Sequence, residues 1–318
     1  MTSTLHTPDR HPLRTLARLA AAAAFLLCAT ASIASAQQSF KTPDEAASAL
    51  VAAAKAGDRK ALLTVLGAAG EDIVSSGDEV ADEGVRKEFV AAYDEKHEIH
   101  PEGDHATLII GNDDFPFPIP LMRKGDAWSF DTEAGRLEVL YRRVGANELD
   151  TIEASLAYVD AQNEYVDKDH GDGVGVYAQR IVSQPDKKDG LYWPSAAGEE
   201  ASPLGELIAA ANEQGYRARG GGERTPFHGY YYKVLTRQGP AAPGGVQDYV
   251  VKGKMIGGFA LVAWPAEYGN SGVMTFIVNH NGTVYQKDLG QRTARVAAGM
   301  TAFNPDDSWK NVDMSELQ

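Results

Sequence analysis

The sequence has 318 residues, and its 44 acidic and 30 basic side chains give a formal net charge of −14 at pH 7. Such a surface repels nucleic acids and anionic lipid headgroups, so we expect the chain to bind neither. Cys28 is the only cysteine, which excludes an intramolecular disulfide and any site built from several thiolates.

The first 36 residues are typical of a cleavable export signal. Three arginines precede an apolar run over residues 19–27, and Ala34-Ser35-Ala36 predicts cleavage before Gln37. The apolar run is shorter than the roughly 20 residues that span a bilayer as a helix. We therefore predict an exported protein, periplasmic or secreted, with no transmembrane anchor after cleavage. Cleavage also removes Cys28 and leaves 27 basic and 43 acidic side chains, a net charge of −16.

Residues 37–131 have the pattern of a compact α+β unit. Thr42 and Glu45 form a capping box that begins a helix, and Asp58 caps a shorter second helix. A third helix is expected over residues 78–96, with inward-facing side chains at Val85, Phe89, Val90 and Tyr93. Alternating apolar residues then predict a small antiparallel meander over residues 106–110, 115–122 and 127–131.

Residues 132–318 predict a second unit, in which one long helix packs on an antiparallel sheet. The helix is expected over about residues 133–166, because apolar residues recur at three- and four-residue spacing, namely Leu149, Ile152, Leu156, Val159 and Val166. Gly145 is a candidate bend in it. Five runs predict strands over residues 230–236, 248–251, 258–264, 273–279 and 283–287. Asn281 and Gly282 indicate a type I′ turn between the last two.

Several motifs together resemble one bacterial family, the exported proteins known as domain of unknown function 2950. The motifs are Phe115-Pro116-Phe117-Pro118-Ile119-Pro120, residues 147–165, Gly190-Leu191-Tyr192-Trp193-Pro194, residues 239–245 and residues 264–276. The resemblance covers nearly the whole chain after residue 36. It implies export and no particular activity.

A second resemblance concerns the C-terminal unit. Ala161, Gln162 and Tyr165 near the end of the long helix, followed by the strand Gly229-Tyr230-Tyr231, are similar to the soluble heads of pilin-like proteins. That resemblance implies an antiparallel sheet packed on one helix. A pilin keeps an apolar N-terminal helix continuous with its head helix, whereas a cleavable signal and a separate unit precede the helix here. Assembly into a pilus by the usual route is therefore not expected.

Three histidines form the first candidate metal site. His97, His100 and His105 lie within nine residues, and imidazoles at this density can bind zinc or copper. His97 and His100 would share a face if the segment were helical. The alternative is a solvated helix C-terminus, where histidines interact favourably with the helix dipole.

Three aspartates form the second candidate metal site. Asp167, Asp169 and Asp172 lie in a segment similar to a calcium-binding loop, although its fifth and twelfth positions lack the oxygen ligands of an EF-hand. The alternatives are a looser calcium site and a glycine-rich turn that ends the long helix. No cofactor is expected otherwise.

Catalytic motifs are absent from the sequence: it has no Gly-x-Ser-x-Gly elbow, phosphate loop or dinucleotide fingerprint. His228 or His280 could pair with a distant serine or aspartate. The aromatic residues Tyr192, Trp193, Tyr230, Tyr231, Tyr232 and Trp264 are interpreted as core residues, with a sugar- or peptide-binding platform as the alternative.

The sequence therefore predicts an exported, non-catalytic α+β protein that binds an envelope or extracellular protein, or a polymer at the cell surface. The alternative is a metal-dependent enzyme or pocket-type binding protein that uses His97, His100 and His105.

Overall fold

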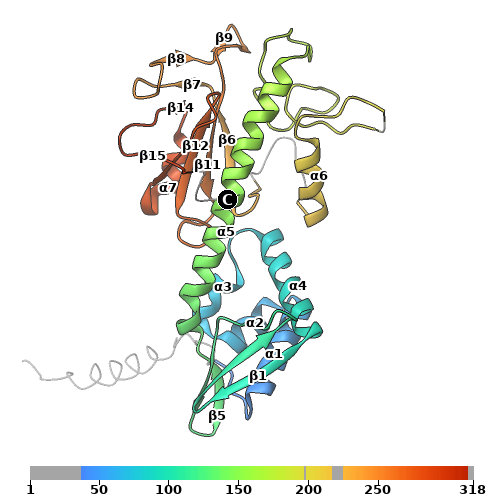
Figure 1. Cartoon of the computed structure of the whole chain (residues 1–318), viewed down its shortest axis with the longest axis vertical. Helices are drawn as coiled ribbons and strands as arrows, with labels where there is room; N and C mark the ends of the chain where they lie inside the picture. Colours follow the sequence, from blue (N-terminus) through green and yellow to red (C-terminus); the bar gives the residue numbers. More distant parts are fainter. Residues whose placement is uncertain (1–36, 197, 217–224, 314–318) are drawn as a thin grey trace, which may run out of the picture. The chain divides into compact units, whose positions relative to one another are not determined.

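The computed structural model describes residues 37–196, 198–216 and 225–313 (Figure 1). The predicted export signal, residues 1–36, lies outside the described residues. From Gln37 onward the chain forms one compact unit. Within the described ranges, the helices are either too short or too polar to cross a membrane.

The N-terminal helices are α1 (Pro43–Ala56), α2 (Arg59–Leu66), a 3₁₀ turn η1 (Ala68–Gly70), α3 (Glu71–Val74) and α4 (Glu79–Glu95). The first two begin at the predicted caps. Thr42 Oγ1 accepts the Glu45 amide, and Asp58 accepts the Ala61 amide. The inward placement of Val85 is wrong, because this side chain is 61% exposed. The apolar clusters around α4 contain later residues of the helix and do not reach its second turn.

The predicted meander is present and larger than expected. Its antiparallel strands are β1 (His97–Glu102), β2 (His105–Ile110), β3 (Phe115–Pro116), β4 (Leu121–Lys124) and β5 (Ala127–Phe130). The sequence pattern did not indicate β1, because this strand carries mostly exposed polar residues. The run over residues 115–122 divides into β3 and β4, since its prolines cannot donate ladder hydrogen bonds.

The second half is built on α5 (Thr132–Val166), which continues without interruption through Gly145. A central antiparallel sheet follows in the order β15-β13-β12-β11-β6, made of β6 (Tyr230–Leu235), β11 (Ala260–Pro265), β12 (Met274–Asn279), β13 (Val284–Asp288) and β15 (Lys310–Asn311). Successive residues of β6 point to opposite faces of the sheet and contact different helices. Tyr232 Oη donates to Thr151 Oγ1 on α5, whereas Lys233 Nζ donates to carbonyls at the end of α7 (Thr293–Gly299). Helices α5 and α7 thus cover opposite faces (Figure 1).

Two expectations about the strands need correction. Residues 248–251 do not join the central sheet: β8 (Gln247–Asp248) pairs with β7 (Arg237–Gln238), which also pairs with β14 (Ala302–Phe303), and β9 (Val250–Val251) pairs with β10 (Lys254–Met255). The turn after β12 is not type I′, because only its glycine has a positive φ. Gly282 (φ 76°) donates its amide to Asn279, the pattern of a type I turn followed by a left-handed glycine.

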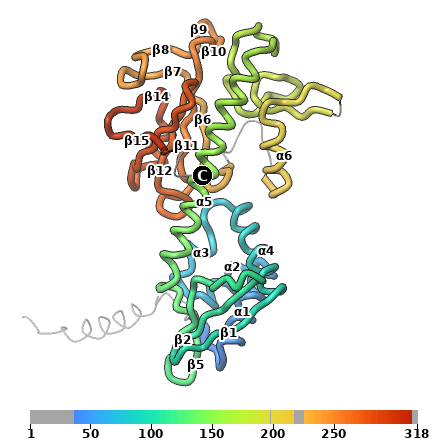
Figure 2. The backbone as a smooth tube through the Cα atoms, viewed as in Figure 1, coloured from blue at the N-terminus to red at the C-terminus, as the bar shows by residue number. Residues whose placement is uncertain are grey.

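A long segment, residues 167–204, connects α5 to α6 (Gly205–Gln214), and its described residues form isolated bridges instead of helices or strands (Figure 2). Gln162 of α5 anchors this segment by exchanging two hydrogen bonds with the Ala178 backbone, at 2.7 and 2.9 Å. Leu191 and Trp193 pack into the core of the second half. The hydrogen bonds of Gln162 and the packing of these two side chains therefore hold the segment against α5 and the core.

Apolar side chains gather in separate clusters on either side of residue 131. One cluster joins α1, α2 and the meander, and another joins the C-terminal half of α5 to the central sheet. The predicted α+β class is confirmed. The division into units at residues 131 and 132, and the likeness to pilin heads, stay predictions.

Two glycines of α5 provide a matched stability test. A Cβ at Gly135 would lie 2.5 Å from the Pro118 carbonyl oxygen, whereas a Cβ at Gly145 would meet nothing within 4 Å. We expect Gly135→Ala to lower the free energy of unfolding by about 2 kcal/mol through overpacking. Gly145→Ala should raise it by about 1 kcal/mol through helix propensity. Urea unfolding measures both, and equal effects would contradict the close approach at residue 135.

Candidate functional site

The three histidines of the first candidate metal site lie on the β1–β2 hairpin. His97 stacks on Tyr93, with ring centroids 3.8 Å apart. His100 lies three residues further along the same strand, so its side chain points to the opposite face of the sheet. Glu102 shares that face with His100, and His105 is paired with Glu102, so His105 lies on the same face as well. The expectation of a shared helix face is wrong, because β1 begins at His97. No group of three His, Cys, Asp or Glu side chains in the described ranges is placed to hold a metal ion.

The three aspartates of the second candidate site make separate contacts at the end of α5. Asp167 follows the last helical residue. Asp169 Oδ1 accepts the amides of two following glycines at 2.8 Å each, and these bonds lower the pKa of Asp169. The Asp172 carbonyl accepts Lys254 Nζ at 2.6 Å. The segment forms a glycine-rich turn that is closed by the Asp169 carboxylate.

The aromatic residues contribute mainly to the core. Tyr230 and Trp264 are buried, and Tyr230 Oη donates to the Met274 carbonyl at 3.0 Å. Trp193 is also buried, and its indole nitrogen donates to the Glu200 carbonyl at 3.2 Å. These side chains are therefore held by internal contacts and do not form an open platform.

His228 pairs with an aspartate, as the sequence allowed. Its Nδ1 lies 2.7 Å from Asp150 Oδ2 on α5. The imidazole also contacts the rings of Tyr216 and Phe227, with centroids 5.7 and 4.2 Å away. His228 has a φ of 49°, a left-handed conformation that non-glycine residues rarely adopt. The pair fastens the chain before β6 to α5, next to a set of buried polar contacts.

The carboxylate of Asp78 is buried and accepts four hydrogen bonds in that set. Oδ1 caps α4 by accepting the amides of Val80 and Ala81 at 3.2 Å each. Oδ2 accepts the Tyr216 hydroxyl at 2.8 Å and the Gly229 amide at 2.9 Å. Burial and the nearby carboxylate raise the pKa of Tyr216, which keeps its hydroxyl a donor. One carboxylate thus joins the start of α4 to the segment before β6.

Arg143 makes a second connection of this kind. Its guanidinium donates to the Asp72 and Ile73 carbonyls at 2.6 Å each and to Asn270 Oδ1 at 2.5 Å. The Asn270 amide group in turn donates to the Ser75 carbonyl at 2.9 Å. Burial lowers the pKa of Arg143, opposed by nearby acidic side chains. Arg143 therefore joins α3, the middle of α5 and the loop between β11 and β12.

The next turn of α5 holds the same loop. Asn147 Nδ2 donates to the Ser271 carbonyl at 2.8 Å. Glu148 Oε1 accepts the amides of Val273 and Met274 at 2.9 Å each. The motif at residues 264–276 thus provides the backbone and side-chain groups by which the central sheet is attached to α5.

We call this set the polar junction, and it comprises Asp72, Ile73, Ser75, Asp78, Arg143, Asn147, Glu148, Tyr216, Gly229, Asn270, Ser271, Val273 and Met274. Its charged side chains each bond internal partners, and these bonds connect segments that lie far apart in the sequence. Sequence reasoning missed the junction. The available signal was the polar residue Asn147 within the motif at residues 147–165.

The surface of α5 carries a different feature. Leu137, Tyr141 and Leu149 are 53%, 69% and 44% exposed, and Gly145 continues the same four-residue spacing. We call these four residues the exposed column. The inward placement predicted for Leu149 is wrong, because Ile152 and Val159 lie on the face that packs on the sheet. The spacing of residues 137, 141, 145 and 149 was the signal that sequence reasoning overlooked.

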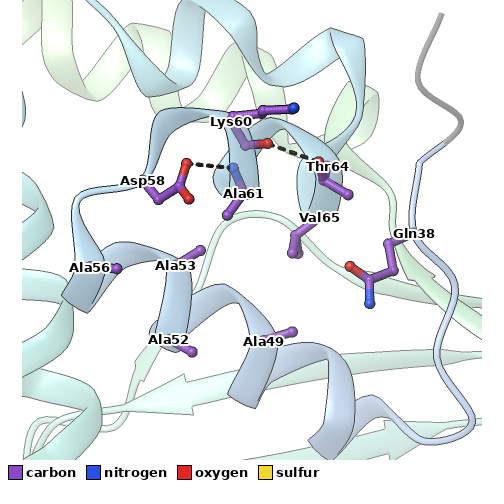
Figure 3. A pocket seen from close by; sticks show the side chains of 10 residues that line it. All are labelled: Gln38, Ala49, Ala52, Ala53, Ala56, Asp58, Lys60, Ala61, Thr64 and Val65. Atoms are coloured by element: carbon purple, nitrogen blue, oxygen red, sulfur yellow. Dashed lines mark hydrogen bonds between the residues drawn. The ribbon is translucent and has the colours of Figure 1, made fainter. Parts of the chain in front are cut away.

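A groove of about 560 Å³ lies between α1 and α2 (Figure 3). Ala49, Ala52 and Ala53 lie along its α1 side. The carboxylate of Asp58 at its edge caps α2, and the Thr64 hydroxyl donates to the Lys60 carbonyl. These are the surfaces of two packed helices, and the groove offers no converging reactive groups.

Asp78 provides the first prediction for the site. Asp78→Ala removes four acceptor contacts at once and should lower the free energy of unfolding by about 3 kcal/mol. The control is Asp160→Ala, an exposed position on α5, which should stay within about 0.5 kcal/mol of the parent. Chemical denaturation measures the free energy of unfolding of both variants. Equal values would contradict a structural role for Asp78.

His170 provides a pH-dependent prediction. Its ring stacks on Tyr165 at 4.0 Å, Nε2 has no hydrogen-bond partner in the described ranges, and burial lowers its pKa below the ordinary 6.5. Protonation therefore disfavours the folded state, so stability is complete above about pH 6.5 and falls as the pH drops through the folded pKa. His170→Phe keeps the stacked ring and should flatten this fall, whereas His100→Phe, at an exposed position, should not. Melting temperatures of the parent and both variants, measured as the pH is lowered from above 6.5, test this prediction. An unchanged dependence of melting temperature on pH in His170→Phe would refute the role given to His170.

Comparison with known proteins gives one family. The family model described as "Protein of unknown function (DUF2950)" matches residues 37–312. No curated protein and no solved structure is significantly similar to the chain. The match spans the meander, α5, the polar junction and the central sheet. The chain therefore belongs to the DUF2950 family, as its motifs predicted.

Proposed function

We propose that the chain is an exported, non-catalytic protein that binds a partner protein in the cell envelope or outside the cell, through the exposed column of α5. The export signal at residues 1–36 supports the location. The exposed column is the observation that carries the binding role.

The column differs from ordinary isolated apolar surface residues. Its members recur every four residues, so neighbouring members touch and the strip winds through about 120° of the helix surface. Tyr141 is 69% exposed, which is unusual for a large aromatic side chain on a helix whose other faces pack on two cores. Aromatic and leucine side chains aligned in this way are typical of helix surfaces that bind a partner.

The polar groups support the non-catalytic part of the proposal. Asp78 is buried and Arg143 is half-buried, both with internal partners, and Glu148 accepts two backbone amides. His228 is paired with Asp150. The internal partners of these groups support a structural role for them.

Photo-crosslinking tests the proposal in the cells that produce the chain. A photoreactive phenylalanine analogue at position 141 should give one discrete adduct, in the envelope or culture-medium fraction, with a chain that begins at Gln37. The control is the same analogue at Val85, an exposed apolar position on α4, which should give none. No adduct from position 141, or identical adducts from both positions, would refute the proposal.

A further inference from the structure

Gln37 is the first residue after the predicted cleavage point, and its side chain is held by the fold. Nε2 of its carboxamide donates to the Phe130 carbonyl at 2.8 Å and to the Val65 carbonyl at 3.1 Å. Phe130 ends β5, and Val65 lies in the last turn of α2. Because a carboxamide nitrogen carries two N–H donors, this one group joins Gln37 to two separate elements.

The residues after Gln37 hold the same segment through their backbone. The Gln38 amide donates to the Thr64 carbonyl at 2.9 Å. Phe40 and Trp128 exchange two backbone hydrogen bonds of 2.8 Å each, and the Phe40 side chain is buried in the apolar cluster of α1, α2 and the meander. The segment over residues 37–40 is therefore docked on the end of α2 and on β5.

Gly67 provides the surface on which the Gln37 side chain lies. A Cβ at Gly67 would lie 3.2 Å from Cβ and 3.3 Å from Cδ of Gln37, which is closer than ordinary side-chain contacts allow. The φ of Gly67 is 79°, a conformation that favours glycine. Glycine at position 67 thus permits the close approach that brings the carboxamide to its two acceptors.

We propose that Gln37 is a modification site that the fold keeps closed. An N-terminal glutamine cyclises to pyroglutamate when its α-amine attacks the side-chain carbon Cδ. An N–Cδ bond forms, the Cδ–Nε2 bond breaks, and Nε2 leaves as ammonia with the proton that the amine gives up, so no further reactant is needed. The inference rests on the cleavage before Gln37 that the proposed function includes, and it adds the chemical fate of the new N-terminus.

The contacts of Gln37 oppose this reaction in the folded chain. Nε2 donates to Val65 and Phe130 and is also the atom that departs, so the two hydrogen bonds stabilise the open glutamine and are lost on ring closure. Cyclisation therefore proceeds from the minor population in which residues 37–40 have left α2 and β5. The cyclic product lacks Nε2, so a chain that has reacted cannot restore these contacts. Pyroglutamate at residue 37 thus records detachment of the segment irreversibly.

Mass spectrometry follows the loss of ammonia from a chain that begins at Gln37, released from a cleavable fusion partner so that export and partner binding play no part. The folded chain should cyclise at least about tenfold more slowly than a synthetic peptide of residues 37–46, because two hydrogen bonds of ordinary strength have to break first. In urea the chain should react at the rate of the peptide. Equal rates for the folded chain and the peptide would overturn the inference.

Two glycine substitutions separate the packing on Gly67 from a general loss of stability. Gly67→Ala should accelerate cyclisation of the folded chain about fivefold, the equivalent of one ordinary hydrogen bond. The matched control is Gly57→Ala, which places a Cβ at another positive φ, 62°, where it meets nothing within 4 Å, and which should react at the rate of the parent. Melting temperatures establish that both variants are folded.

A folded Gly67→Ala variant that cyclises no faster than Gly57→Ala would also overturn the inference. If Gly67→Ala does not fold, the comparison of the folded parent with the peptide decides alone. Either result leaves the proposed function standing, because the partner is absent from the experiment. A failed crosslink at position 141 likewise leaves the closed state of Gln37 untouched.

Discussion

The fold depends on charged side chains, one of them fully buried, that connect the parts of the chain holding the two largest apolar clusters. Moving a carboxylate or a guanidinium out of water costs several kcal/mol unless its hydrogen-bonding capacity is met, so the polar junction is stable only when complete. Asp78 receives four donors, and Arg143 reaches three acceptors. Because these bonds join segments far apart in the sequence, the junction makes the position of each segment depend on the others.

The junction also explains why the middle of α5 is exposed on one side. Arg143, Asn147 and Thr151 form an inward row at four-residue spacing, and that row is occupied by the junction and the central sheet. Tyr141 and Gly145 precede Arg143 and Asn147 by two residues, which places them about 200° around the helix, on the far side. A helix of 35 residues that is fixed at both ends and along one row therefore presents a continuous free face.

Local signals made much of the fold predictable. The caps at Thr42 and Asp58 and the periodicity of α5 act within a few residues, and the structure follows them. Two of the features that sequence reasoning missed, strand β1 and the polar junction, depend on distant contacts. Strand β1 is held by its pairing with β2 and lacks an apolar pattern of its own. Asn147 was a signal for a polar position on the helix, but the partners in the junction could not be predicted, because no spacing in one sequence reveals that Arg143 meets Asn270, 127 residues away.

Calorimetric unfolding of the chain from Gln37 onward, with and without the double substitution Asp78→Ala and Arg143→Met, tests the central role of the junction most directly. The parent should unfold in one transition whose calorimetric and van't Hoff enthalpies agree, because the junction couples the two clusters. The double variant should unfold in two transitions, one for each cluster. Two separate transitions in the parent, or a single unshifted transition in the variant, would contradict this account.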